Sequence, residues 1–131
     1  MQQIDTGLAS LVIVAKYHNI PAELHQLERA YVLEPGAVDT TTLVRAARDY
    51  RLKVRAYENV KPERLKNMVF PAIIRMKNGR YIVITGMNDQ HMFICAPAFS
   101  SQPMEANRQK VLEGWTGEVM LFTRRFQLEE K

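Results

Sequence analysis

The stretch FPAIIRMKNGRYIVITG, residues 70–86, consists of two apolar runs separated by Lys77-Asn78-Gly79-Arg80. Asparagine followed by glycine favours the left-handed backbone of a tight turn, and between two apolar runs it is the strongest short-range indication of a β-hairpin. The stretch therefore predicts two antiparallel strands, at 70–75 and 81–85.

The segments around this hairpin extend it into a larger predicted sheet. Apolar and charged residues alternate at 52–57, which is typical of a half-buried strand. Further strands are expected at 91–95, after a turn through 88–90, and at 118–122. The elements expected between the strands are a single helical turn at 61–65 and a weak helix at 104–112.

Three helices are predicted before the sheet. Residues 6–18 are apolar on more than one face, which favours a helix buried in the core. Pro21 suits the first turn of a second helix, expected at 21–30 after a break, and a turn is expected at 34–36. Asp39 and the three threonines that follow it offer N-caps for a third helix, whose apolar face repeats at Leu43, Ala46, Ala47 and Tyr50. Helices followed by strands predict an α+β fold, with the helices packed on an antiparallel sheet of four to six strands.

The composition is that of one domain. With 131 residues, 47% of them hydrophobic, the chain is expected to fold over residues 1–126, with 127–131 as a charged linker. Its longest apolar run, 11–15, is far shorter than the ~20 residues that span a bilayer. The net charge of +4 is spread along the chain, so no nucleic-acid partner is expected. A single cysteine suits a reducing, cytoplasmic setting.

Cys95 and His91 are the first candidates for catalysis, because a thiol and an imidazole can form a nucleophile and its base. Four residues of strand would separate them by ~13 Å, whereas such a pair needs hydrogen-bond contact. Cys95 is therefore interpreted as a small buried hydrophobic residue, and His91 as a turn residue. The three histidines, at 18, 25 and 91, have no metal-ligand spacing, and no cofactor motif is present, so neither metal nor cofactor is expected.

Three segments together resemble the bacteriocin-processing cysteine peptidase domains found at the N-termini of bacterial ABC exporters. DTGLASLVIVAKYHN, residues 5–19, is similar to the family's opening Asp-Cys-Gly-x-Ala-x-Leu helix. FPAIIRMKNGRYIVITG is similar to its segment of Pro, apolar strand and Asn-His-Phe-Val-Val-Leu. MFICAPA, residues 92–98, resembles its Val-x-Asp-Pro-Ala. The order and spacing match across most of the chain, and the resemblance implies a papain-like fold.

The resemblance also places the family's catalytic triad on residues that cannot perform its chemistry. Thr6 stands where the family has its nucleophilic cysteine, Tyr81 where it has the general-base histidine, and Ala96 where it has the orienting aspartate. A threonine hydroxyl needs a base, and tyrosine at neutral pH is a phenol. We therefore expect Thr6, Tyr81 and Ala96 to line an inactive cleft, with Cys95 on the opposite face of its strand, away from it. Tyr81 either closes that cleft or is simply one more aromatic residue of the sheet.

Degenerate domains of this kind resemble those of type I secretion exporters for haemolysin-type toxins and large calcium-binding repeat adhesins. The resemblance implies a domain at the cytoplasmic face of the bacterial inner membrane that binds the unfolded secreted protein. It also implies transmembrane and ATP-binding domains beyond Lys131. Arg124 and Arg125 then suit a position near the membrane, and a solvated strand end explains them equally well. Two alternatives are a docking domain that contacts only other transporter domains, and a residual peptidase using Thr6 or Cys95.

Overall fold

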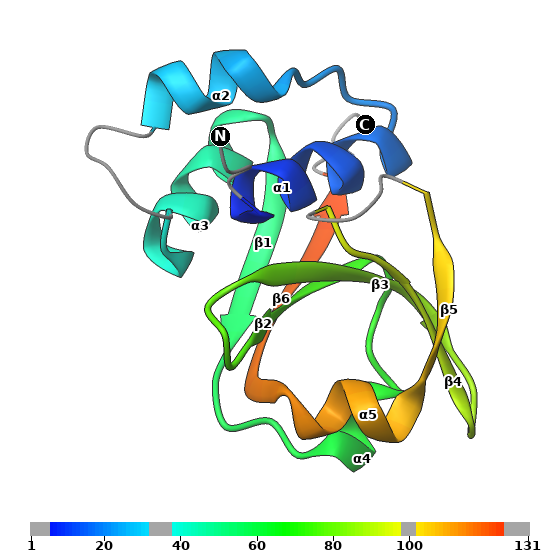
Figure 1. Cartoon of the computed structure of the whole chain (residues 1–131). Helices are drawn as coiled ribbons and strands as arrows, with labels where there is room; N and C mark the ends of the chain where they lie inside the picture. Colours follow the sequence, from blue (N-terminus) through cyan, green and yellow to red (C-terminus); the bar gives the residue numbers. More distant parts are fainter. Residues whose placement is uncertain (1–5, 32–37, 98–101, 125–131) are drawn as a thin grey trace, which may run out of the picture.

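The computed structural model describes residues 6–31, 38–97 and 102–124. Helices come first along the chain and strands dominate its second part, which confirms the predicted α+β class (Figure 1). In chain order, the elements are α1 (Thr6–Tyr17), α2 (Leu24–Tyr31), α3 (Thr40–Asp49), β1 (Leu52–Tyr57), α4 (Pro62–Leu65), β2 (Ala72–Met76), β3 (Tyr81–Met87), β4 (His91–Cys95), β5 (Met104–Asn107), α5 (Arg108–Glu113) and β6 (Trp115–Arg124).

The strands form one six-stranded antiparallel sheet in the order β1-β6-β2-β3-β4-β5. The last strand, β6, lies between β1 and β2, where Phe122 is opposite Val54 and Met120 is opposite Ile73. β1 therefore joins the sheet only through the C-terminal strand, and β1 and β5 are its two edges.

In the hairpin between β2 and β3, Met76 and Arg80 are opposite each other and close a loop of three residues, 77–79. The Met76 N–H donates to the Arg80 carbonyl at 2.8 Å, and Gly79 has φ +88°, a left-handed conformation that glycine adopts without a Cβ clash. This loop sets the register so that Arg75 lies directly opposite Tyr81.

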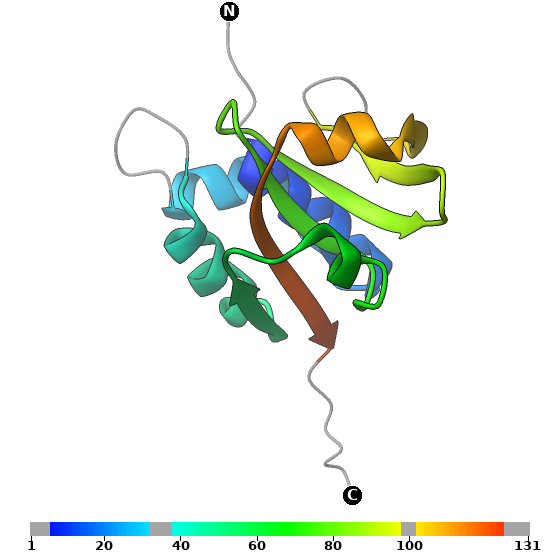
Figure 2. The ribbon, with the colours of Figure 1, turned by 90° about the horizontal axis from the view of Figure 1, so that it is seen from below.

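The sheet has an apolar core on each face. Helices α1, α2 and α3 cover one face, and α4 and α5 cover the other (Figure 2). Because alternate strand residues point to opposite faces, the strands β2, β3, β4 and β6 each contribute to both cores, whereas β1 contributes buried residues only to the first. The first core, on the side of α1, includes Leu8, Leu11, Leu43, Ile73, Tyr81, Val83, Cys95 and Phe122. The second core includes Leu65, Ile74, Ile82, Ile84, Ile94, Ala96, Val111 and Trp115.

Two predicted helix boundaries can be compared with the structure. Among the residues that the sequence offered as caps, Asp39 is the N-cap of α3, and its side chain accepts the Thr42 N–H at 3.0 Å. The prediction that α2 begins at Pro21 was wrong, because α2 begins at Leu24. Its hydrogen-bond ladder starts with the Glu23 carbonyl, which accepts the Leu27 N–H at 3.1 Å, so the chain before Glu23 lies outside the helix.

The helix predicted at 104–112 was wrong for its first half. Residues Met104–Asn107 pair with β4 as strand β5, so their backbone groups bond across the sheet. Helix α5 begins only at Arg108, because the Asn107 side chain caps it by accepting the Lys110 N–H at 3.2 Å.

Some predictions fall outside the described residues, namely the turn at 34–36 and the charged linker at 127–131. Within the ranges that the structure describes, no helix has both the length and the apolar character needed to cross a membrane.

Candidate functional site

Thr6 connects the first helix to the centre of the sheet. It is the first residue of α1 and is 7% exposed. Its Oγ1 accepts a buried hydrogen bond from the Tyr81 N–H at 2.9 Å, between residues 75 positions apart in sequence. The structure therefore brings Thr6 into direct contact with the Tyr81 backbone, and the threonine hydroxyl satisfies a buried backbone donor.

The Tyr81 side chain is inserted between the sheet and α3. Its ring is 1% exposed, and its hydroxyl lies 3.0 Å from Thr40 Oγ1 at the start of α3. Thr40 Oγ1 also donates to Glu118 Oε1 at 3.4 Å. The guanidinium of Arg75 lies over the ring, 5.4 Å from its centroid, within the range of a cation–π contact.

These surroundings keep Tyr81 neutral. Burial raises the pKa of its phenol, while the Thr40 hydrogen bond and the nearby Arg75 charge act in the opposite, weaker direction. A phenol whose pKa lies above its ordinary value holds its proton at neutral pH. Tyr81 is therefore a neutral phenol here and is not available as a general base.

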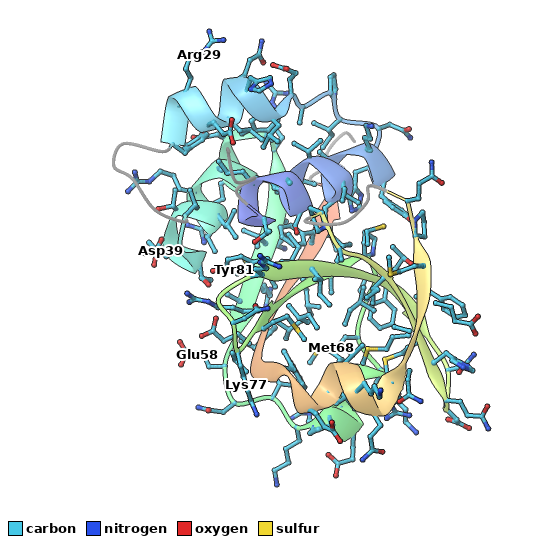
Figure 3. All side chains as sticks on the ribbon, in the orientation of Figure 1. Arg29, Asp39, Glu58, Met68, Lys77 and Tyr81 are labelled. Atoms are coloured by element: carbon cyan, nitrogen blue, oxygen red, sulfur yellow. The ribbon has the colours of Figure 1, made fainter. Side chains whose placement is uncertain are left out.

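A half-open polar pocket of about 270 Å³ lies beside Tyr81, at the N-terminal end of α3. Figure 3 shows two of its residues, Asp39 and Tyr81, close together. Its polar lining consists mainly of Asp39, Thr40, Tyr57, Arg75, Tyr81 and Glu118. The N-cap hydrogen bonds from Thr42 hold the pKa of Asp39 below its ordinary value. No histidine or cysteine lines this pocket among the described residues.

Ala96 does not join Thr6 and Tyr81. It lies in the second core, on the other face of the sheet, and is 7% exposed. The expectation that Cys95 points away from the cleft was wrong, because Cys95 belongs to the first core together with Tyr81 and Leu8. The alternation of β4 was predicted correctly, but the face that each residue occupies was assigned the wrong way round.

Cys95 and the histidines do not form a catalytic pair in the described residues. Cys95 is 1% exposed, as predicted for a core residue, and burial raises the pKa of its thiol. His91 Nδ1 lies 3.2 Å from Glu105 Oε2 at the end of the β3–β4 turn, and His25 Nδ1 lies 3.5 Å from Glu28 Oε1 on α2. No group of three His, Cys, Asp or Glu side chains within the described ranges is arranged to hold a metal ion.

Sequence reasoning missed most of the residues that line the pocket, among them Thr40, Arg75 and Glu118. Thr40 was noticed only as part of a run of threonines that offers helix caps. The position of Arg75 depends on the three-residue loop, because a two-residue Asn-Gly loop would place Met76 opposite Tyr81. Glu118 reaches the pocket only because β6 lies beside β2, and no local pattern indicates that pairing.

The sequence matches the Peptidase C39 family over residues 1–127. It is 32% identical over 120 residues to the cyclolysin secretion/processing ATP-binding protein CyaB of Bordetella pertussis, covering 89% of this chain and 16% of that protein. It is 25% identical over 120 residues to the alpha-hemolysin translocation ATP-binding protein HlyB of Proteus vulgaris, covering 91% and 17%. The chain thus spans about a sixth of the length of these curated relatives.

Solved structures give the same result. A double glycine motif protease from an AMS/PCAT transporter, solved with its leader peptide, superposes with a TM-score of 0.83 and 25% identity, covering 93% of this chain and 86% of that one. The N-terminal peptidase C39 like domain of a toxin secretion ATP-binding protein from Vibrio parahaemolyticus has a TM-score of 0.77 and 21% identity, covering 95% and 99%. The resemblance to exporter peptidase domains is confirmed, and this chain belongs to the peptidase C39 family.

Proposed function

We propose that this chain is a non-catalytic domain of a type I secretion ABC exporter, and that it binds the unfolded exported protein before or during transport. The observation that carries the proposal is the buried contact between Thr6 and Tyr81. The residue at the family's nucleophile position accepts a hydrogen bond from the backbone of the residue at its base position, at 2.9 Å.

The surroundings of Thr6 support the absence of peptidase activity. Acyl transfer by a hydroxyl needs a base that removes its proton and a group that orients the base. The Tyr81 side chain points to Thr40 instead, and Ala96 supplies no polar group. The buried, protonated thiol of Cys95 is an unsuitable alternative nucleophile. We expect no metal or cofactor to take part.

The comparisons support a role in export. The curated relatives are named as ATP-binding proteins that translocate or secrete toxins, and one structural relative was solved with a leader peptide. By analogy, the partners of this domain are the exported polypeptide and the transmembrane and nucleotide-binding domains of its own transporter, at the cytoplasmic face of the inner membrane. The exported protein is of the RTX toxin or adhesin type.

The test is an NMR titration of the ¹⁵N-labelled chain with the C-terminal part of the protein that its transporter exports. The exported protein is added once unfolded without calcium and once folded with calcium. We expect shifts confined to one surface, and only with the unfolded form. No shifts with either form would overturn the binding role and leave a docking domain.

A cleavage assay tests the absence of catalysis separately. The chain is incubated with a double-glycine leader peptide, and with the exported protein, and the products are followed by mass spectrometry. We expect no cleavage. Cleavage that disappears in Thr6→Ala or Cys95→Ser would overturn the proposal.

A further inference from the structure

The first edge of the sheet is open for pairing. β1 is hydrogen-bonded only to β6, from Leu52 opposite Arg124 to Tyr57 opposite Val119. No other backbone or side-chain hydrogen bond to residues 52–57 occurs in the described part of the chain. An edge strand of this kind presents a row of unpaired N–H and C=O groups to which another extended segment can bond.

A hollow of about 620 Å³ follows this edge. Its wall consists of Val44 and Arg48 from α3 and of five consecutive residues of β1, 53–57. Consecutive strand residues point to opposite faces of a sheet, so a hollow lined by five in a row lies along the strand's edge and not over one face. An added strand would fit along it, with side chains of alternating residues directed to α3 and to the outer face.

The hollow is positively charged. Arg48, Lys53 and Arg55 line it and are exposed, and no acidic residue contributes to its wall. Within the described ranges, none of the three forms an ion pair. The nearby Asp49 accepts a hydrogen bond from the Tyr31 hydroxyl. Because like charges disfavour a basic segment and opposite charges attract an acidic one, the hollow selects an acidic partner.

A neighbouring hollow with apolar and charged residues continues from the same edge. Tyr57, which is 40% exposed, lines it together with the apolar Val60, Met68 and Leu121. The charged residues of this second hollow are Glu58, Lys61 and Arg64, so its bases outnumber its single acid. A partner with apolar residues between its acidic ones can therefore bury them there. The opposite edge of the sheet lacks this charge pattern, because β5 has only four residues and carries Glu105.

We propose that an extended acidic segment of the exported polypeptide binds along the free edge of β1 as an additional antiparallel or parallel strand. This site rests on the proposed function, since it assigns the surface and the chemistry of the same binding event. Main-chain hydrogen bonds would give affinity, and Arg48, Lys53 and Arg55 would give selectivity for acidic side chains.

The probe is a short soluble peptide in which glutamate alternates with threonine and valine, titrated into the ¹⁵N-labelled chain. One control peptide has lysine in place of glutamate, and another is the acidic peptide N-methylated at alternate residues. We expect amide shifts centred on 53–57, no binding of the lysine peptide, and at least about tenfold weaker binding of the methylated peptide, because it cannot donate the main-chain hydrogen bonds. Shifts centred elsewhere, or equal binding of either control peptide, would overturn the site.

Two triple variants separate local from overall charge. The edge variant reverses the charge of the hollow and carries Arg48→Glu, Lys53→Glu and Arg55→Glu. The control variant makes the same change in net charge at exposed positions outside the hollow and carries Lys66→Glu, Arg80→Glu and Lys110→Glu. We expect the edge variant to bind the acidic peptide at least about tenfold more weakly and the control variant to stay within about twofold of the unmodified chain. Equal losses in both variants would overturn the proposal.

Titration with the unfolded exported protein distinguishes failure of the β1 site from failure of the proposed function. If it binds the unmodified chain and the edge variant equally well, the β1 site is wrong while the proposed function stands. If it does not bind the unmodified chain at all, the proposed function fails, whatever the short peptide does.

Discussion

The junction of α1 with β3 and the outer edge of β1 belong to the same half of the molecule and differ in how their polar groups are used. At the junction, Thr6 and Tyr81 are buried; the Thr6 hydroxyl accepts the Tyr81 N–H, and the Tyr81 hydroxyl is hydrogen-bonded to Thr40. Along the edge, Lys53, Arg55, Ala56 and Tyr57 are exposed, and one row of β1 backbone groups has no partner in the part of the chain that the structure describes.

This difference in burial and hydrogen bonding indicates which of the two regions can bind a ligand. A buried group that already has its hydrogen-bond partner must break that bond before it can contact anything else, which costs stability. The backbone groups of an exposed edge give up only their hydrogen bonds to water when they bind a partner. Substitutions at the junction should therefore change folding, and substitutions at the edge should change binding.

The largest effect is expected for Tyr81→Ala. Removing a fully buried aromatic ring leaves a cavity in the first core, and we expect the free energy of unfolding to fall by about 3–5 kcal/mol. Tyr81→Phe, which keeps the ring and loses only the hydroxyl bonded to Thr40, should cost about 1 kcal/mol. Urea unfolding measures both. Similar losses in the two variants would mean that the hydroxyl, and not the ring, stabilises this junction.

Thr6→Val should have the next largest effect. The valine has nearly the same shape but cannot accept the Tyr81 N–H, so a buried donor is left unsatisfied at a cost of about 1–3 kcal/mol. Thr6→Ser retains the acceptor and is the matched control. Amide hydrogen exchange of Tyr81 should accelerate in Thr6→Val beyond the change in global stability. Unchanged exchange would contradict the assigned hydrogen bond.

Asp39 lies between the two regions, at the N-terminus of α3, and Asp39→Ala should cost about 1 kcal/mol through loss of the cap. Hydrogen bonds hold the folded-state pKa of Asp39 below its unfolded value, so its contribution is present at neutral pH and is lost as the pH falls through the folded-state pKa. Thermal unfolding from pH 7 to pH 3 should show the wild-type advantage shrinking. Asp39→Asn, which can still cap, should lose little stability at pH 7.

The smallest effect on stability is expected for the triple reversal of Arg48, Lys53 and Arg55. These side chains are exposed and form no ion pair within the described ranges, so we expect the free energy of unfolding to change by no more than about 0.5 kcal/mol. Binding of the acidic peptide should nevertheless fall. A large loss of stability in this variant would contradict the claim that edge substitutions change binding and leave folding intact.

Much of the fold could be predicted because its signals are local. The Asn78-Gly79 hairpin, the alternation in the first four residues of β1 and a cap at the start of α3 depend on residues only a few positions apart, and each occurs in the structure. The alternation ends at Ala56, which is exposed although its position in the pattern predicts burial. The prediction failed at Met104–Asn107, where pairing with β4 decides the conformation. That pairing brings together residues such as Phe93 and Glu105, which no local window contains.

The candidate site divides in the same way. From the sequence alone, the resemblance to the family predicts that Thr6 and Tyr81 stand at the positions of its nucleophile and base, where neither side chain could perform that chemistry. Only the tertiary structure decided that the Tyr81 N–H bonds to Thr6, that Ala96 lies on the other face, and that β1 is left as an edge. The physical reason is that side-chain chemistry is a property of each residue, whereas strand order and register depend on packing between segments far apart in the chain.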